Sequence, residues 1–102
     1  MKKLTLTLLM VLVLASGVWA TSPVVVIKSY AFTSARIEVK AGTTVVWVNH
    51  DDSPHTVTSR DGMLKSKPLD TNEQFSYTFK KPGTYPYYCT LHPQMQGVVV
   101  VK

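Results

Sequence analysis

The sequence predicts an all-β domain, a sandwich or barrel of short antiparallel strands, that follows a signal peptide. Three observations support this prediction. Apolar and polar residues alternate in short runs, turn residues separate these runs at regular intervals, and no stretch keeps a helical period. Evenly spaced short strands with turns between them are typical of β-sandwiches and β-barrels.

The N-terminal 20 residues have the three parts of a secretory signal peptide. Met1-Lys2-Lys3 is charged, residues 4–15 are apolar, and Val18-Trp19-Ala20 ends on a small residue. The alternative is a retained membrane anchor, but the apolar run is shorter than the roughly 20 residues that span a bilayer. We therefore expect cleavage after Ala20, Sec-type export to the periplasm, and a mature domain of residues 21–102 without stable membrane insertion.

The mature part divides into runs that predict strands in residues 23–27, 37–40, 43–49, 56–58, 75–79, 84–89 and 97–102. The second and third runs flank Ala41-Gly42 and are expected to form a hairpin. In the third run Val45 and Trp47 share one face. Pro82-Gly83 predicts a turn, and Pro86 is expected to kink the strand that contains it.

Aromatic residues supply much of the predicted core. Phe75, Tyr77 and Phe79 alternate with polar residues, which is the pattern of a half-buried strand. Together with Trp47 they are expected to pack between the sheets.

Cys89 is the only cysteine, so the mature domain must fold without a disulfide. An unpaired cysteine in an exported protein requires an explanation, and metal ligation provides one. Without Lys2 and Lys3, nine basic residues face six acidic ones, a net charge of +3. This excess permits steering towards an acidic partner. The basic residues form no block, and we expect no nucleic-acid partner.

Near the C-terminus a thiol, an imidazole and a thioether follow one another at three-residue spacing in Cys89, His92 and Met95. A second imidazole, supplied by His55, completes the donor set of a blue-copper electron-transfer site. Each residue alone has a simpler explanation, because buried cysteine and methionine are common in cores and a single histidine is more often structural. Their order, spacing and flanking strands together favour one copper ion per chain.

In these residues the chain resembles the cupredoxins, the type 1 blue copper proteins, and most closely those of the amicyanin and plastocyanin type. The resemblance covers nearly all of residues 21–102 and implies a Greek-key sandwich. It also implies a monomeric electron carrier that cycles between Cu(II) and Cu(I). Such a carrier would take electrons from a periplasmic dehydrogenase and pass them to a c-type cytochrome or a similar acceptor.

For the site, the resemblance implies a trigonal plane of His55, Cys89 and His92, with Met95 as a weak axial ligand. The backbone amide of Thr56 is expected to donate to the sulfur of Cys89. Further contacts are expected from Asn49 or Thr90, which would brace the loops, and from an apolar patch around His92 formed by Leu91, Pro93 and Pro54. The helix that some relatives carry between His55 and Cys89 is expected to be absent.

The residues disfavour four alternatives. An enzyme is disfavoured because the short domain has neither a further cluster of histidines nor the second cysteine that a second copper ion would need. A copper-binding or copper-transfer protein without an electron-transfer role is also disfavoured. Such proteins tend to be rich in methionine and histidine, whereas Met63 and Met95 are the only methionines of the mature chain. A structural zinc site would have no use for a thioether. His50 is an alternative ligand to His55, but it directly follows a predicted strand.

Overall fold

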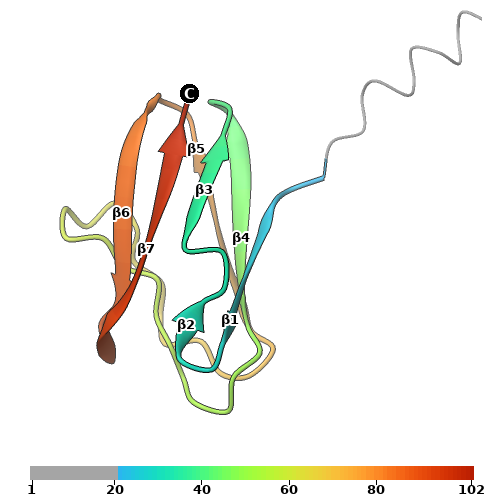
Figure 1. Cartoon of the computed structure of the whole chain (residues 1–102), viewed down its shortest axis with the longest axis vertical. Coiled ribbons are helices and arrows are strands. Elements are labelled where there is room, and N and C mark those ends of the chain that lie inside the picture. Colours follow the sequence, from blue (N-terminus) through green and yellow to red (C-terminus); the bar gives the residue numbers. More distant parts are fainter. Residues whose placement is uncertain (1–20) are drawn as a thin grey trace, which may run out of the picture.

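The computed structural model describes residues 21–102, so the predicted signal peptide lies outside the described residues. Within that range the chain forms strands and no helix, which confirms the all-β prediction. The strands are β1 (Val24–Lys28), β2 (Ala31–Phe32), β3 (Arg36–Val39), β4 (Thr43–Asn49), β5 (Gln74–Phe79), β6 (Gly83–Cys89) and β7 (His92–Val101). They form two sheets, in the orders β2-β1-β4-β5 and β3-β7-β6 (Figure 1).

Both sheets are mixed rather than purely antiparallel. β1 runs parallel to β4, and β3 runs parallel to β7, whereas the other neighbours are antiparallel. The predicted hairpin of residues 37–40 and 43–49 is therefore wrong, because β3 and β4 belong to different sheets. Gly42, at a φ of +96°, turns the chain from one sheet into the other. Alternation shows that a strand has a buried face, but it does not show which sheet that strand joins.

The core lies between the two sheets and is built around Trp47. This residue and Val45 are fully buried on one face of β4, as the alternation predicted. The ring of Trp47 lies 5.8 Å from that of Phe75 and 5.3 Å from that of Tyr87. Phe79 is also buried, and Phe75 and Tyr77 pack against the core while partly exposed. The predicted aromatic core is thus present.

A long segment, residues 50–73, connects β4 to β5 and closes the lower end of the sandwich in Figure 1. The expected strand at residues 56–58 is reduced to isolated bridges, among them Thr58 with Lys65 and Thr58 with Tyr88. The segment contains no helix, in agreement with the prediction. Among residues 21–102 no helix is long and apolar enough to cross a bilayer.

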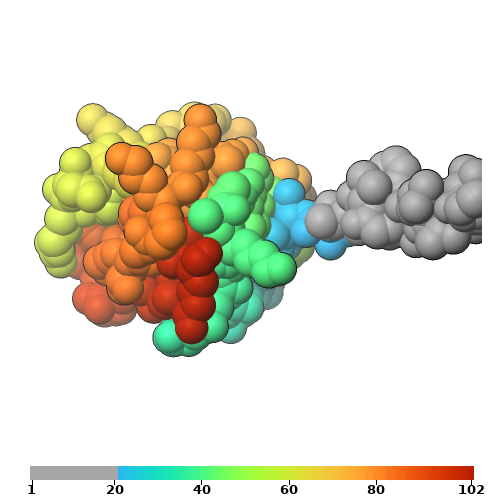
Figure 2. All heavy atoms as spheres, turned by 90° about the horizontal axis from the view of Figure 1, so that it is seen from above, coloured from blue at the N-terminus to red at the C-terminus, as the bar shows by residue number. Residues whose placement is uncertain are grey.

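The last two strands form one long hairpin. β6 continues through Pro86, which opposes Val98, and the expected kink does not interrupt the pairing. β7 begins at His92 rather than at Gly97, so the whole predicted metal motif lies on this hairpin. Figure 2 looks onto the opposite end of the molecule. There the turns before β4 and before β6 meet the C-terminal residue, and the amide of Ala41 donates to the carbonyl of Lys102.

Candidate metal centre

Cys89 and His92 face each other across the tight turn between β6 and β7. They are paired in the strand register, with only Thr90 and Leu91 between them. Residues that oppose each other on antiparallel strands present their side chains on the same face. The Sγ atom of Cys89 and the Nδ1 atom of His92 accordingly lie 3.8 Å apart. The three-residue spacing in the sequence is therefore the spacing of a two-residue hairpin turn.

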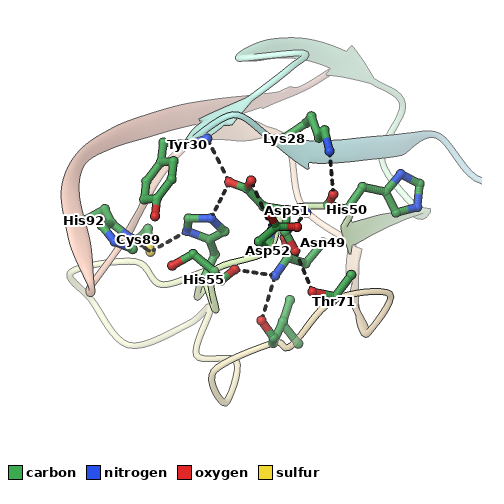
Figure 3. Close-up of polar contacts among 12 residues, drawn as sticks. Lys28, Tyr30, Asn49, His50, Asp51, Asp52, His55, Thr71, Cys89 and His92 are labelled. Atoms are coloured by element: carbon green, nitrogen blue, oxygen red, sulfur yellow. Dashed lines mark hydrogen bonds and ion pairs between the residues drawn. The ribbon is translucent and has the colours of Figure 1, made fainter.

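His55 reaches the same point from the segment between β4 and β5. Two backbone hydrogen bonds hold it against Leu69, one from each amide to the other carbonyl. The imidazole is fully buried, and its Nδ1 atom lies 3.8 Å from Sγ of Cys89 (Figure 3). His50, the alternative ligand, is exposed and stands outside this group.

The two nitrogen–sulfur separations are those that a trigonal metal site requires. The ligating atoms of His55, Cys89 and His92 all lie within 4.8 Å of one another. For a first-row metal, bonds of about 2.0 Å to nitrogen and 2.3 Å to sulfur, spread at 120°, would separate nitrogen from sulfur by about 3.7 Å. The two nitrogen–sulfur separations of 3.8 Å match this value.

Hydrogen bonds donated and accepted by Thr56 fix the sulfur and the turn that carries it. Its backbone amide donates to Sγ of Cys89 at 3.3 Å, as the resemblance implied. Its hydroxyl oxygen accepts a hydrogen bond from the amide of Thr90 at 2.8 Å and lies 2.9 Å from the Thr90 hydroxyl. The Thr56 side chain therefore connects the loop that carries His55 to the loop that carries Cys89 and His92.

Asn49 braces the loop that leads to His55. Its amide nitrogen donates to the carbonyls of Ser53 at 2.9 Å and Leu69 at 2.8 Å, and its side-chain oxygen accepts from the amide of Asp51 at 2.8 Å. The residue is fully buried, so these three bonds satisfy polar atoms that water does not reach. Both bracing residues expected from the resemblance, Asn49 and Thr90, are thus part of the network.

Asp51 was missed by the sequence analysis, although it contacts a predicted ligand directly. Its Oδ2 atom lies 2.9 Å from Nε2 of His55 and accepts a hydrogen bond from the amide of Tyr30. The hydrogen bond from the Tyr30 amide, and then that from His55, lower the pKa of the Asp51 carboxyl. A carboxylate only accepts hydrogen bonds. Nε2 of His55 is therefore the donor in this hydrogen bond, and Nδ1 is the nitrogen that faces Cys89.

A family model described as a cupredoxin-like domain matches residues 4–101. The chain belongs to the cupredoxin family. The amicyanin of Paracoccus versutus is 34% identical over 95 residues, which cover 88% of this chain and 72% of that protein. Amicyanin-alpha of Methylorubrum extorquens is 38% identical over 88 residues, with 81% and 74% covered.

Solved amicyanin structures have the same fold. The Cu(I) form of an amicyanin mutant matches with a TM-score of 0.77 at 36% identity, over 86% of this chain and 89% of that chain. The crystal structure of the Paracoccus versutus amicyanin matches with a TM-score of 0.77 at 33% identity, over 86% and 88%.

In this cupredoxin the remaining predicted ligand, Met95, is also buried. Its exposed fraction is 3%, and it packs in the core on the same strand as His92. The register shifts between Tyr88 and Cys89, so residues 93–95 have no partner in the ladder and the chain bulges there. Pro93, which has no amide hydrogen to donate, stands in this bulge.

Several exposed apolar side chains flank the residues of the site. Leu91 is 48% exposed and Tyr30 is 49% exposed, and both are among the largest exposed apolar side chains of residues 21–102. Pro54 and Pro93 are exposed as well, whereas His92 itself is only partly buried. The three residues that the resemblance placed in an apolar patch are therefore exposed. Tyr30 was missed, because no sequence pattern connects it with the motif.

Proposed function

We propose that this cupredoxin is a small electron carrier of the periplasm rather than an enzyme. Its mature form, residues 21–102, would hold one type 1 copper ion with His55, Cys89, His92 and Met95. The observation that supports this most strongly is the convergence of one thiol and two imidazole nitrogens within 4.8 Å of one another. A thiolate, two imidazoles and a weak thioether are the donor set of blue-copper electron-transfer sites.

The residues around the site suit a carrier because they hold the donors in fixed positions. Copper, held by these residues, would supply the one-electron step between Cu(II) and Cu(I). The Thr56 amide orients the sulfur of Cys89, and the Asp51 carboxylate orients the ring of His55. Partners that orient ligands in this way also tune a metal. Little of the protein then has to move when the charge on the metal changes, and this favours rapid electron transfer.

The apolar surface around His92 is the proposed contact face for redox partners. Leu91, Pro54 and Pro93 are exposed beside the partly buried imidazole, so a partner that covers them would come close to a ligand. Small apolar contacts of this kind suit the brief encounters of redox proteins. A donor dehydrogenase and a c-type cytochrome or similar acceptor are the proposed partners of a monomeric carrier.

The alternative, a copper-transfer protein, requires ligands that an incoming acceptor can replace. His55 and Cys89 are fully buried, and Met95 is 3% exposed. An acceptor could approach only through His92, which leaves the other donors covered. The burial of these three donors therefore favours electron transfer over copper transfer.

Visible spectroscopy of the copper-loaded mature protein tests the copper assignment. We expect an intense blue colour from charge transfer between the thiolate and Cu(II), loss of that colour in Cys89→Ser, and its retention in the control His50→Ala. A colourless Cu(II) complex, or a Cys89→Ser variant that stays blue, would contradict the site. Rapid oxidation of the reduced protein by a c-type cytochrome is expected. Transfer of copper to an acceptor protein at a higher rate than transfer of electrons would favour the copper-transfer alternative.

A further inference from the structure

The turn between β1 and β2 has an unusual backbone. Lys28 opposes Ala31, so the turn consists of Ser29 and Tyr30 alone. Both residues have positive φ values, 53° and 58°. A two-residue hairpin turn with two positive φ angles is normally made of asparagine, aspartate or glycine. A bulky side chain such as that of Tyr30 is a real outlier there, at a cost of about 1–3 kcal/mol.

The ring of Tyr30 is placed against both histidines of the metal centre. Its centroid lies 4.7 Å from that of His92, at an interplanar angle of 86°, and 5.2 Å from that of His55, at 88°. Both are edge-to-face contacts, the arrangement that aromatic pairs prefer. Figure 3 shows the ring beside the two imidazoles, on a turn that belongs to neither loop bearing a ligand.

The backbone of Tyr30 reaches the same centre by a second route. Its amide donates to Oδ2 of Asp51 at 2.9 Å, and that same oxygen lies 2.9 Å from Nε2 of His55. Asp51 is 7% exposed, so both contacts are shielded from water. The ring of Tyr30 thus contacts both His92 and His55. Its backbone is also connected to His55, through Asp51.

We propose that Tyr30 is a positioning residue of the metal centre. Its ring restricts rotation of the His55 and His92 imidazoles, and the strained turn exists to place that ring. The inference rests on the proposed copper site and adds a residue from outside the metal motif. To leave the metal, the partly exposed imidazole of His92 must rotate about its side-chain bonds. The edge-on ring of Tyr30 obstructs that rotation, so it slows the release of copper.

The decisive variant is Tyr30→Asn, because stability and metal retention should change in opposite directions. Asparagine tolerates the left-handed conformation, so the metal-free variant should be more resistant to urea than the wild type. Without the ring, copper release to a chelator should be about tenfold faster. An aromatic contact of typical strength corresponds to a factor of about ten in a rate or equilibrium constant. Tyr30→Phe keeps the ring and should release copper within about twofold of the wild-type rate.

Ser29→Asn is the matched control, since it relieves strain at the adjacent turn position without touching either histidine. It should stabilise the metal-free protein and leave copper release unchanged. If Tyr30→Asn releases copper at the wild-type rate, or if Ser29→Asn accelerates release as much, Tyr30 has no positioning role. A wild-type protein that is not blue would instead contradict the copper site itself.

A measurement on the wild type makes the test independent of whether the variants fold. Proton NMR of the metal-free wild type should show contacts between the ring protons of Tyr30 and those of both His55 and His92. In the variants, the electron paramagnetic resonance spectrum of the Cu(II) form should change in Tyr30→Asn and not in Ser29→Asn. Missing ring contacts in the wild type would overturn the inference.

Discussion

Asp51 and His55, four residues apart on one loop, share a hydrogen bond of 2.9 Å that determines which imidazole nitrogen faces Cys89. The carboxylate accepts a hydrogen bond from Nε2, and Nδ1 is the nitrogen that faces Cys89. The hydrogen bond between the two side chains also depends on the position of the Asp51 backbone. Asn49 and Thr71 hold the backbone of Asp51 in place through its amide and its carbonyl.

Replacing Asp51 by alanine should therefore weaken copper binding without removing a ligand. Loss of a partner that orients a ligating histidine typically costs about 10- to 100-fold in metal affinity. Asp51→Asn should lose less, because its amide oxygen still accepts a hydrogen bond from Nε2. Competition titration with a copper chelator measures the affinity. The exposed neighbour Asp52 provides the control, and an effect of Asp52→Ala equal to that of Asp51→Ala would contradict this role.

Met95→Leu should keep copper and raise the reduction potential. A thioether is a weak axial donor, so its loss destabilises Cu(II) more than Cu(I) and leaves the three strong donors in place. Voltammetry of the loaded variant measures the shift, and Met63→Leu serves as the control for a methionine outside the motif. Complete loss of copper from Met95→Leu would show instead that the thioether is a primary ligand or that the loop needs it for folding.

Gly97→Ala should destabilise the domain. Gly97 opposes Tyr87 across the β6–β7 ladder, and a Cβ atom there would collide with the phenol ring. That ring is 2% exposed and is packed against Phe32 and Trp47, so it has little room to shift. Overpacking of this kind costs about 1–3 kcal/mol. Urea unfolding measures the loss, with Gln96→Ala at the exposed neighbouring position as the control. An unchanged unfolding midpoint would mean that the ring moves freely.

Glu73 should make part of the stability dependent on pH. Hydrogen bonds from the amide of Asp70 and then from Lys67 lower the pKa of its carboxyl below the ordinary glutamate value of 4.5. The folded state therefore holds the proton less tightly than the unfolded state. This contribution is complete above pH 4.5 and is lost as the pH falls through the lowered value.

Unfolding of the metal-free protein at neutral and acid pH measures that contribution, since copper loss then has no influence. Glu73→Gln should lose less stability on acidification than the wild type. Asp70→Asn, which keeps the Asp70 amide, is the control. Identical acid dependence in the wild type and in Glu73→Gln would argue against a role for this carboxyl.

Much of the fold and most of the site followed from local pattern. Alternation located β4 and β5 and the burial of Trp47, and the spacing of Cys89 and His92 matched a hairpin turn. Sheet membership could not be predicted, because β3 pairs with β7 in parallel and the partners are far apart in the sequence. The start of β7 was placed too late, since Pro93 and the bulge interrupt the alternation that marks a strand.

The two residues missed at the site illustrate the same limit. Asp51 has the composition of an ordinary loop residue, and only the folded loop brings its carboxylate to His55. Tyr30 carries no turn propensity, so its strained conformation contradicts local preference. Exceptions to local preference are found where the surrounding structure over-determines a residue, often at functional sites.

The parallel pairing of β3 with β7 has a consequence for the order of folding. Ile37 opposes Val99, and contacts so distant in the chain close slowly because a long loop must first be ordered. β7 carries His92 and Met95 and forms the hairpin with Cys89. Until this strand docks, the lone thiol is open to oxidants and foreign metals. Slow docking therefore lengthens the period in which Cys89 can be lost before the site has formed.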